Sequence, residues 1–345
     1  MLRLTHEILF DIAKELIEAG NEEDVYKFAL SGKEPFQATA KAFGAVTTLE
    51  LYDDRFVIGW DNRCTSFEIK KYKPRCKFLL NQIGNCVQKL HVNGYCVIFS
   101  FMSPYIFTSI LDKIIAKKQL VSFSSNSLVN ESFVNKFLPM FSSTLKNVTI
   151  QSSLMTETLR DTLNLKSLTI LDSYDFKLAQ NCCKTSSLII HDGLFEFETR
   201  ALKISDVSQY LSLIKDLTFA ENFCYTMSRK LLIKITKYFP SLESLNFNIT
   251  LGKYNKTYES IEKEIKESTI KLVKAIKQTI KVPEKITCTF YKFEENMKFP
   301  NINICKRRIF HGFKFDASIM KFRCFCKIIQ TAGQKTTILE VRIAK

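Results

Sequence analysis

The residue types that perform chemistry are few in this chain and do not form a known catalytic pattern. Its four histidines, His6, His91, His191 and His311, lie far apart. None of the motifs G-x-S-x-G, G-x-x-x-x-G-K-S/T, G-x-G-x-x-G and H-E-x-x-H occurs. With 10 glycines in 345 residues, a phosphate-cradling loop is not expected. We therefore predict a protein that is not an enzyme, with histidines that face solvent or are hydrogen-bonded.

The 11 cysteines do not predict a metal site. No C-x-x-C occurs, whereas structural zinc needs four convergent ligands that are commonly offered as closely spaced pairs. Cys182 and Cys183 are adjacent, and Cys324 and Cys326 point to the same face of one predicted strand. We expect free thiols that behave as small buried hydrophobes, no metal and no cofactor.

A short basic run, Lys306-Arg307-Arg308, is followed by Phe310 and His311. Such cations suit phosphate contacts, and a nearby aromatic ring can stack on a base. Three charges in a row form a weak signal, and no nucleic-acid fold signature accompanies them. Nucleic-acid binding is therefore only a minor alternative.

Composition indicates a globular chain with a length typical of about two domains. Hydrophobic residues make up 46% and charged residues 25%, which excludes collagen-like and disordered chains. The opening segment MLRLTHEILFDIAKEL carries charges where a signal peptide needs an apolar stretch, so we expect a cytoplasmic or nuclear protein with reduced thiols. The uncharged stretch Val92–Leu111 contains Pro104 and scattered polar residues. It predicts a buried strand, Tyr95–Met102, and then a helix, not a membrane span.

Charge is distributed unevenly along the chain. Residues 1–44 carry 5 basic and 8 acidic side chains, residues 45–249 carry 24 and 18, and residues 250–345 carry 21 and 9. The acidic start and basic end suggest two surfaces with different partners. The simpler interpretation is that the lysines, which are spaced along helices, form solvated faces.

Residues 4–44 predict three short helices. In the first, Thr5 is a suitable N-cap with Glu7 in the first turn, and Gly20-Asn21 ends it. Its apolar residues recur at helical spacing on one face: Leu4, Ile8, Leu9, Ile12 and Leu16. The second helix, Glu22–Leu30, presents Val25, Phe28 and Ala29. Pro35 suits the first position of a third helix that Gly44 ends.

This segment resembles the F-box family. The family's first helix is matched by Leu4, Glu7, Ile8, Leu9, Ile12 and Leu16, and Asn21–Phe36 matches the acidic loop and second helix through Ser31, Lys33 and Phe36. The family's proline is Thr5 here, which can cap the same helix. The resemblance implies binding to a Skp-type linker protein, and through it to a cullin. The implied contact residues are Leu4, Glu7, Ile8, Leu9, Ile12, Leu16, Val25 and Phe28. A generic helical cap is the alternative.

From residue 45 onward, short apolar strand patterns alternate with helical patterns. Their central apolar residues are 20 to 29 positions apart: Val121, Val148, Leu168, Leu188, Leu217 and Leu245. Leucine-rich repeats have this spacing, and the chain resembles an irregular leucine-rich-repeat solenoid. Only the repeat with Asn222 keeps the family's turn asparagine. A helix is expected over 258–281. An ordinary α/β sheet domain is the alternative.

The predicted fold class is thus α/β. A small helical F-box-like unit (1–44) precedes a leucine-rich-repeat-like domain (45–345) with a curved, mainly parallel sheet. Residues 286–345 alternate apolar and polar residues, which predicts a strand-rich cap. We expect a substrate-receptor subunit of a Skp–cullin–F-box ubiquitin ligase, and the basic C-terminal third favours an acidic target protein. The alternative is a repeat-type interaction scaffold without a ubiquitin role.

Overall fold

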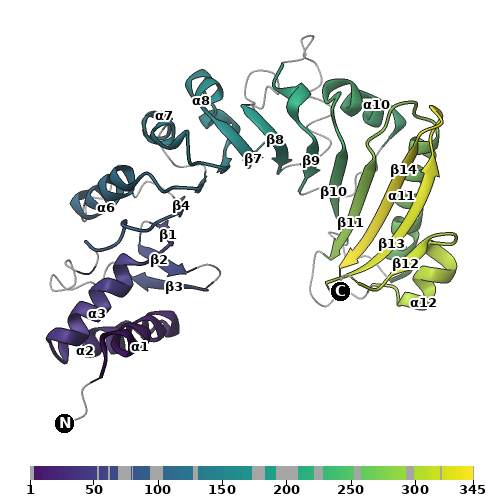
Figure 1. The fold of residues 1–345 in the computed structure, drawn as a ribbon. Coiled ribbons are helices and arrows are strands. Elements are labelled where there is room, and N and C mark those ends of the chain that lie inside the picture. Colours follow the sequence, from purple (N-terminus) through teal and green to yellow (C-terminus); the bar gives the residue numbers. More distant parts are fainter. Residues whose placement is uncertain are drawn as a thin grey trace. The chain divides into compact units, whose positions relative to one another are not determined.

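The computed structural model describes two compact units, Met1–Leu165 and Lys166–Lys345 (Figure 1). The described residues are 4–344 without 53, 61–62, 69–78, 80, 94–103, 127–130, 173–182, 192–208, 221–227, 252–257, 293–298 and 319–320. The predicted strand Tyr95–Met102, together with Cys182 and Asn222, lies outside the described residues.

The first unit begins with three helices: α1 (His6–Ala19), α2 (Glu22–Leu30) and α3 (Lys33–Gly44). The Thr5 hydroxyl accepts a hydrogen bond from the backbone N–H of Ile8, and the Asn21 side chain accepts one from Glu23. Gly20, with φ of 78°, ends α1 in the left-handed region that favours glycine. The predicted caps are confirmed, although α3 begins two residues before Pro35.

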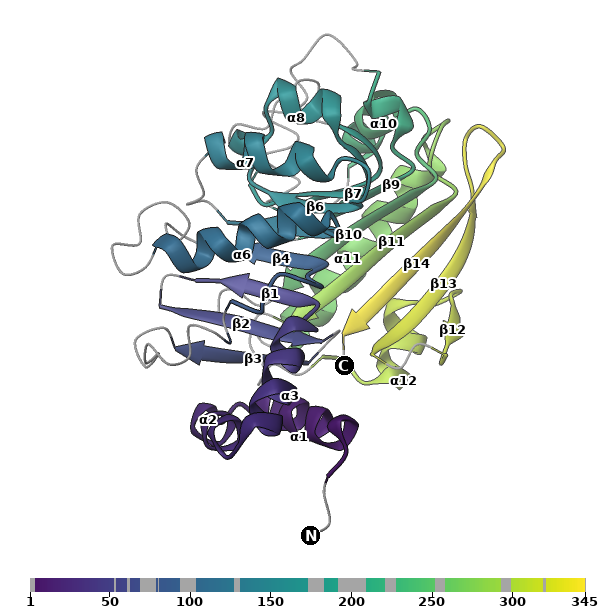
Figure 2. The same ribbon diagram turned by 60° about the vertical axis from the view of Figure 1, so that its left-hand side comes forward.

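Six strands follow in the first unit, in the spatial order β3-β2-β1-β4-β5-β6. Their bounds are β1 (Thr48–Leu51), β2 (Arg55–Trp60), β3 (Arg63–Glu68), β4 (Lys89–Val92), β5 (Ser122–Ser125) and β6 (Asn147–Ile150). Strands β1, β4, β5 and β6 are parallel, whereas β1–β2–β3 is antiparallel. The sequence did not predict β2 and β3. One face carries α6 (Pro104–Lys117), α7 (Glu131–Phe137) and α8 (Glu157–Thr162) (Figure 2).

The second unit holds eight strands in the order β7-β8-β9-β10-β11-β14-β13-β12. They are β7 (Asn164–Ile170), β8 (Lys184–Ile190), β9 (Asp216–Phe219), β10 (Ser244–Leu251), β11 (Lys285–Lys292), β12 (Lys314–Asp316), β13 (Phe322–Gln330) and β14 (Thr336–Ala344). Its helices are α10 (Arg229–Tyr238), α11 (Tyr258–Lys277) and the short α12 (Ile302–Ile304), which continues as a π-helix, Cys305–Ile309. The tail, predicted to be rich in strands, holds β11, β12, β13 and β14. β14 pairs parallel with β11, whereas β12, β13 and β14 are antiparallel.

The central apolar residues of successive strands stand directly opposite one another. In the second unit this row is Leu188, Leu217, Leu245, Ile286 and Leu339, all buried. In the first unit it is Leu49, Leu90, Phe123 and Val148. The predicted alignment of the repeated strand pattern is confirmed at most positions. It was wrong at β5, where Phe123 occupies the row in place of Val121, because the strand begins only at Ser122.

Each sheet is therefore apolar on the face that carries the helices and polar on the other, which we call the open face of that unit. Strand β10 shows the alternation most clearly, since every second residue from Leu245 to Leu251 is buried. The structure thus supports a mixed α/β fold with a mainly parallel sheet in the interior of each unit. Among the described helices, none combines the length and apolar character required to span a bilayer.

Candidate partner-binding surfaces

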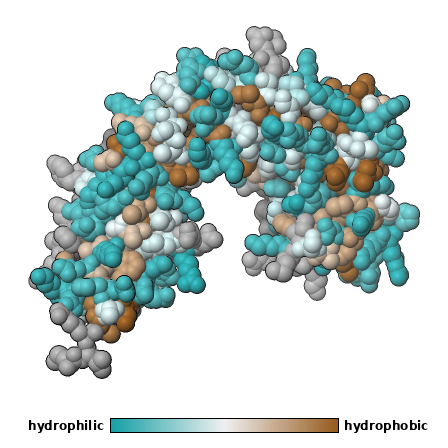
Figure 3. All heavy atoms as spheres, viewed as in Figure 1, coloured by the Kyte–Doolittle hydropathy of each residue, from teal (hydrophilic) through white to brown (hydrophobic). Residues whose placement is uncertain are grey.

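Helix α1 divides its apolar residues between two faces. Leu9, Ala13 and Ile17 are buried. Leu4 and Ile8 are 52% and 46% exposed, while Ile12 and Leu16 are half-buried. Residues four apart lie above one another on a helix, so Ile8, Ile12 and Leu16 form one continuous row. The exposed Leu4 stands just before the N-cap Thr5, and we call Leu4 together with this row the α1 stripe. Figure 3 shows apolar atoms at the surface over the N-terminal helices.

The structure separates the partner-contact residues implied by the F-box resemblance into two groups. Leu9 and Val25 are only 4% and 1% exposed, and they contribute to the internal core of the first unit. Glu7 is exposed and Phe28 is half-buried. Sequence spacing groups Leu9 with the exposed residues of α1, and Val25 with Phe28 on α2, because in each helix it places them near the same side. Burial, however, depends on what packs against that side, so we leave these two out of the proposed contact surface.

The buried side of the N-terminal helices packs against the hairpin β2–β3. Phe67 of β3 stacks on Phe56 at 5.4 Å between ring centroids and lies 6.2 Å from Phe43 of α3. The Thr65 hydroxyl donates a hydrogen bond to the carbonyl oxygen of Glu18 (3.2 Å), and the Glu18 carboxylate pairs with Arg63 (3.1 Å). Helices α1–α3 therefore belong to the first unit, and the expected boundary after residue 44 separates helices from strands within it.

An acidic row borders the α1 stripe. Glu7, Asp11 and Glu15 are exposed and are also four residues apart, so they follow the stripe along the helix. A cavity of about 570 Å³ lies where the turn between α1 and α2 meets the hairpin. It is lined by four carboxylates, those of Glu22, Glu23, Asp54 and Glu68, and by Arg55. This end of the first unit is thus both apolar and acidic.

The open face of the first unit carries a polar row across three parallel strands. Glu50, His91 and Ser124 stand opposite one another on β1, β4 and β5. His91 Nδ1 and Ser124 Oγ are 2.7 Å apart, and the Tyr52 hydroxyl donates a hydrogen bond to Glu50. Burial lowers the pKa of His91, and Glu50 opposes this shift. His91 is therefore hydrogen-bonded, as expected.

This contact is also a nucleophile–base pair that sequence reasoning did not identify, because 33 residues separate its members. Acyl transfer by a serine needs a base held by a third group and donors aimed at the developing oxyanion. In the described residues Glu50 is hydrogen-bonded to Tyr52, and the Ser124 contact uses His91 Nδ1. We interpret the row as a polar ladder of the open face.

The open face of the second unit combines amide ladders, a charged cluster and an aliphatic pair. Asn246 donates to the Thr218 hydroxyl (3.3 Å). Glu340, only 4% exposed, accepts a hydrogen bond from Arg342 and pairs with Lys285, each at 2.5 Å. Burial raises the pKa of Glu340, but hydrogen bonds from Arg342, Lys285 and Cys324 outweigh it and hold the pKa at about 2.

Next to this cluster, Ile328 of β13 and Ile338 of β14 face each other and are 73% and 46% exposed. The sequence predicted the strands but not which of their residues remain exposed.

The cysteines and the basic run are placed mostly as expected. Cys183, Cys288, Cys305 and Cys324 are buried, and burial raises the pKa of Cys183 to about 12. Cys64, in contrast, is exposed on β3, a strand that the sequence did not predict. In the described part of the chain, no group of three or more His, Cys, Asp or Glu side chains is placed to hold a metal.

The basic run lies on the π-helix Cys305–Ile309 and is exposed. The ammonium of Lys306 stands 4.3 Å from the ring centroid of Phe315, so one of its three cations already contacts an aromatic side chain of the same unit.

No family model matches this chain, and no curated protein matches it. Among solved structures, it is similar to a chain of the crystal structure of the Rad7 and Elc1 complex in yeast. That match has 12% identity, covers 86% of this chain and 91% of the other, and has a TM-score of 0.29.

Proposed function

We propose that this protein is a non-catalytic adaptor of F-box type, the substrate receptor of a Skp–cullin–F-box ubiquitin ligase. In this proposal, the α1 stripe binds a Skp-type linker protein, and the open faces of a leucine-rich-repeat-like sheet hold the target. The supporting observation is that α1 carries a second apolar row, Ile8, Ile12 and Leu16, beyond the residues used for its own core, and that the exposed Leu4 stands just before the helix.

The exposed stripe has the chemistry of a docking surface. Burial of a fully exposed Leu or Ile side chain contributes about 1.5–3 kcal/mol, so association that covers Leu4 and Ile8 is favourable. The neighbouring acidic row, Glu7, Asp11 and Glu15, favours a partner groove with basic residues at its edge and speeds the encounter.

The proposed mechanism is proximity. The linker holds one end of the chain, the target binds the other surfaces, and the ubiquitin-transferring subunits act on a lysine that is held near them. The chain itself performs no bond-breaking step. Its proposed location is the cytoplasm or the nucleus, where such partners act.

The proposal is tested by Ile8→Asp in the full chain, with co-purification of a recombinant Skp-type protein as the measurement. Ile8 is 46% exposed, so the variant should fold while a charge stands in the stripe. We expect retention of the linker to fall by at least about tenfold, because the contact loses apolar burial and gains a buried charge.

Ile233→Asp on α10 is the matched control, because Ile233 is 44% exposed and lies in the second unit. It should bind the linker as the unmodified chain does. Equal binding by all three proteins, or no binding by the unmodified chain, contradicts the ligase proposal.

A specific contact favours the second candidate, an interaction scaffold without a ubiquitin role. The helices pack on β3, which is the end strand of the first sheet, through Phe43 and Phe67. Helices that cover an edge strand protect it from pairing with other chains, and this alone explains their presence. Absence of linker binding combined with recovery of another partner through the open faces supports this candidate.

A further inference from the structure

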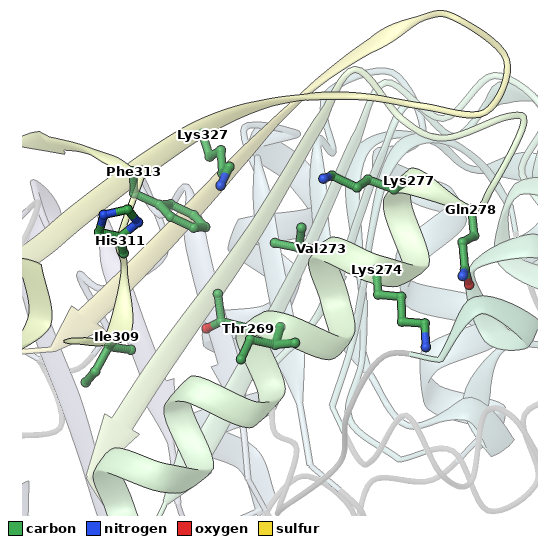
Figure 4. Close-up of a pocket in the computed structure, with 10 residues that line it drawn as sticks. Thr269, Val273, Lys274, Lys277, Gln278, Ile309, His311, Phe313 and Lys327 are labelled. Carbon is green, nitrogen blue, oxygen red and sulfur yellow. The ribbon is translucent and has the colours of Figure 1, made fainter. Parts of the chain in front are cut away.

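A cavity of about 480 Å³ lies in the second unit between the C-terminal half of α11 and the segment around β12 and β13 (Figure 4). The helix contributes Val273, Lys274 and Lys277. The other wall contributes Phe313 and Lys327, with further lining residues that include Ile309 and His311. Residues about 50 positions apart thus meet at one place.

The walls of this cavity are strongly basic. Its lining includes three lysines and no Asp or Glu. The last acidic residue of α11 is Glu267, and the charged residues that follow it up to position 283 are all lysines. Cations near a helix C-terminus complement the helix dipole, which accounts for Lys274 and Lys277. The dipole does not account for Lys327, which comes from β13.

Among the described residues, ion pairs in the second unit are Lys215–Glu243, Lys263–Glu267, Lys285–Glu340 and Arg342–Glu340. None of them uses a lysine of the cavity. The three lysines of the cavity therefore form no ion pair with another residue of the described part of the chain.

Two of the ammonium groups converge. Figure 4 shows Lys277 and Lys327 directed toward each other across the cavity, with the Phe313 ring beside Lys327. The Lys327 ammonium lies 5.1 Å from the centroid of that ring. Two ammonium groups that converge repel each other, whereas an anion between them is attracted by both. A phosphate monoester carries about 1.5 to 2 negative charges near neutral pH and offers three acceptor oxygens, which suits two ammonium donors.

The rest of the lining is mixed: Ile270, Val273, Ile309 and Phe313 are apolar, and Thr269, Gln278 and His311 are polar. Ile309 is buried, and Val273 and Phe313 are half-buried beside the lysines. We propose that this cavity binds a phosphate monoester carried by a protein segment with an apolar side chain next to the phosphorylated residue. Phe313 is the only Phe, Tyr or Trp in its lining, with the imidazole of His311 as a second ring, whereas single-stranded nucleic acids use a longer series of aromatic platforms. A phosphorylated protein therefore fits better than a nucleic acid.

This inference rests on the proposed function, since it names a class of target, but its test does not. The probe is a capped synthetic pentapeptide with a phosphoserine between two leucines, titrated calorimetrically into the full chain without a linker protein. Its unphosphorylated counterpart, inorganic phosphate and a short oligothymidylate are titrated in parallel. We expect saturable binding of the phosphopeptide, at least about tenfold tighter than each of the other probes.

Variants locate the binding. Lys277→Gln combined with Lys327→Gln should weaken binding of the phosphopeptide by at least about tenfold, since each lysine supplies a charge-assisted contact. Lys271→Gln combined with Lys335→Gln removes the same charge from exposed positions outside the lining and should leave affinity unchanged. Because Lys277 is exposed on the helix, Lys277→Gln alone keeps the test valid if the double variant does not fold.

The proposal is overturned if both double variants weaken phosphopeptide binding equally. It is also overturned if inorganic phosphate binds as tightly as the phosphopeptide, or if the oligothymidylate binds more tightly than the phosphopeptide. The absence of saturable phosphopeptide binding overturns it as well. None of these results bears on linker binding by the α1 stripe, and loss of linker binding in Ile8→Asp does not bear on this cavity.

Discussion

The N-terminal helices and the region around α11 are opposite in charge and in the kind of surface that they present. The first carries the α1 stripe beside an acidic row and a cavity with four carboxylates. The second carries a cavity with three lysines and no carboxylate. A protein with two such surfaces is suited to bind two different partners, one by apolar burial and the other by charge pairing. The contrast therefore supports an adaptor more strongly than either surface does by itself.

The largest expected effect comes from the contact that holds the N-terminal helices on the sheet. Phe67→Ala should lower the free energy of unfolding by about 3–5 kcal/mol, because Phe67 is 1% exposed and packs between Phe43 and Phe56. Urea unfolding measures this change. If the α1 stripe and the lysine-lined cavity are independent, Phe67→Ala weakens linker binding and leaves phosphopeptide binding unchanged. Loss of both linker binding and phosphopeptide binding, while the variant remains folded, contradicts the independence of the two surfaces.

The two faces of α1 can be distinguished by alanine substitutions one position apart. Leu9→Ala should cost about 2–5 kcal/mol of stability because Leu9 is buried in the core. Ile8→Ala, at an exposed position, should change stability by no more than about 0.5 kcal/mol and yet weaken linker binding. Chemical denaturation and co-purification of both variants provide the data. Similar stability losses in the two variants contradict the assignment of Ile8 to a separate stripe.

A smaller effect, confined to the second unit, is expected from the charged cluster on its open face. The pKa of Glu340 is about 2 in the folded protein and near its usual value in the unfolded chain. Because the pKa of Glu340 is lower in the folded protein than in the unfolded chain, its carboxylate stabilises the fold at pH values above about 4.5. This contribution is lost as the pH falls toward 2. Glu340→Gln should therefore cost about 2 kcal/mol at pH 7 and progressively less below pH 4.

Unfolding measured at pH 7 and at pH 3 for the unmodified chain and for Glu340→Gln tests this expectation. A stability difference that stays the same at both pH values shows that the charge of Glu340 is not responsible. Linker binding should be unaffected at pH 7, because the cluster lies outside the first unit.

Local features were predictable because they depend on neighbours in the sequence. Thr5 and Gly20 fix where the first helix begins and ends, Asn21 fixes where the second begins, and the structure confirms these boundaries. The repeated strand pattern placed Leu188, Leu217 and Leu245 in one row, as the register shows. The pattern failed at β5, since Val121 and Phe123 both fit it and only strand pairing selects between them.

Features that depend on distant contacts were not predictable. The strands β2 and β3 were not predicted, and the spacing of residues did not indicate that Leu9 would be covered while Ile8 remains exposed. Spacing places both residues near one side of a helix, and only the packing of the folded unit decides that Leu9 is buried while Ile8 is exposed. The Ser124–His91 contact likewise needs β4 and β5 to pair in register.

The sequence by itself determined the helix caps, the alternation of the strands, the charge difference between the two ends and the scarcity of catalytic motifs, since each is written in residue types a few positions apart. Only the tertiary structure decided which apolar row of α1 faces solvent and that Lys277 and Lys327 line one cavity. The physical reason is that burial and convergence are properties of packed surfaces. Those surfaces are formed by segments that meet only after the chain has folded.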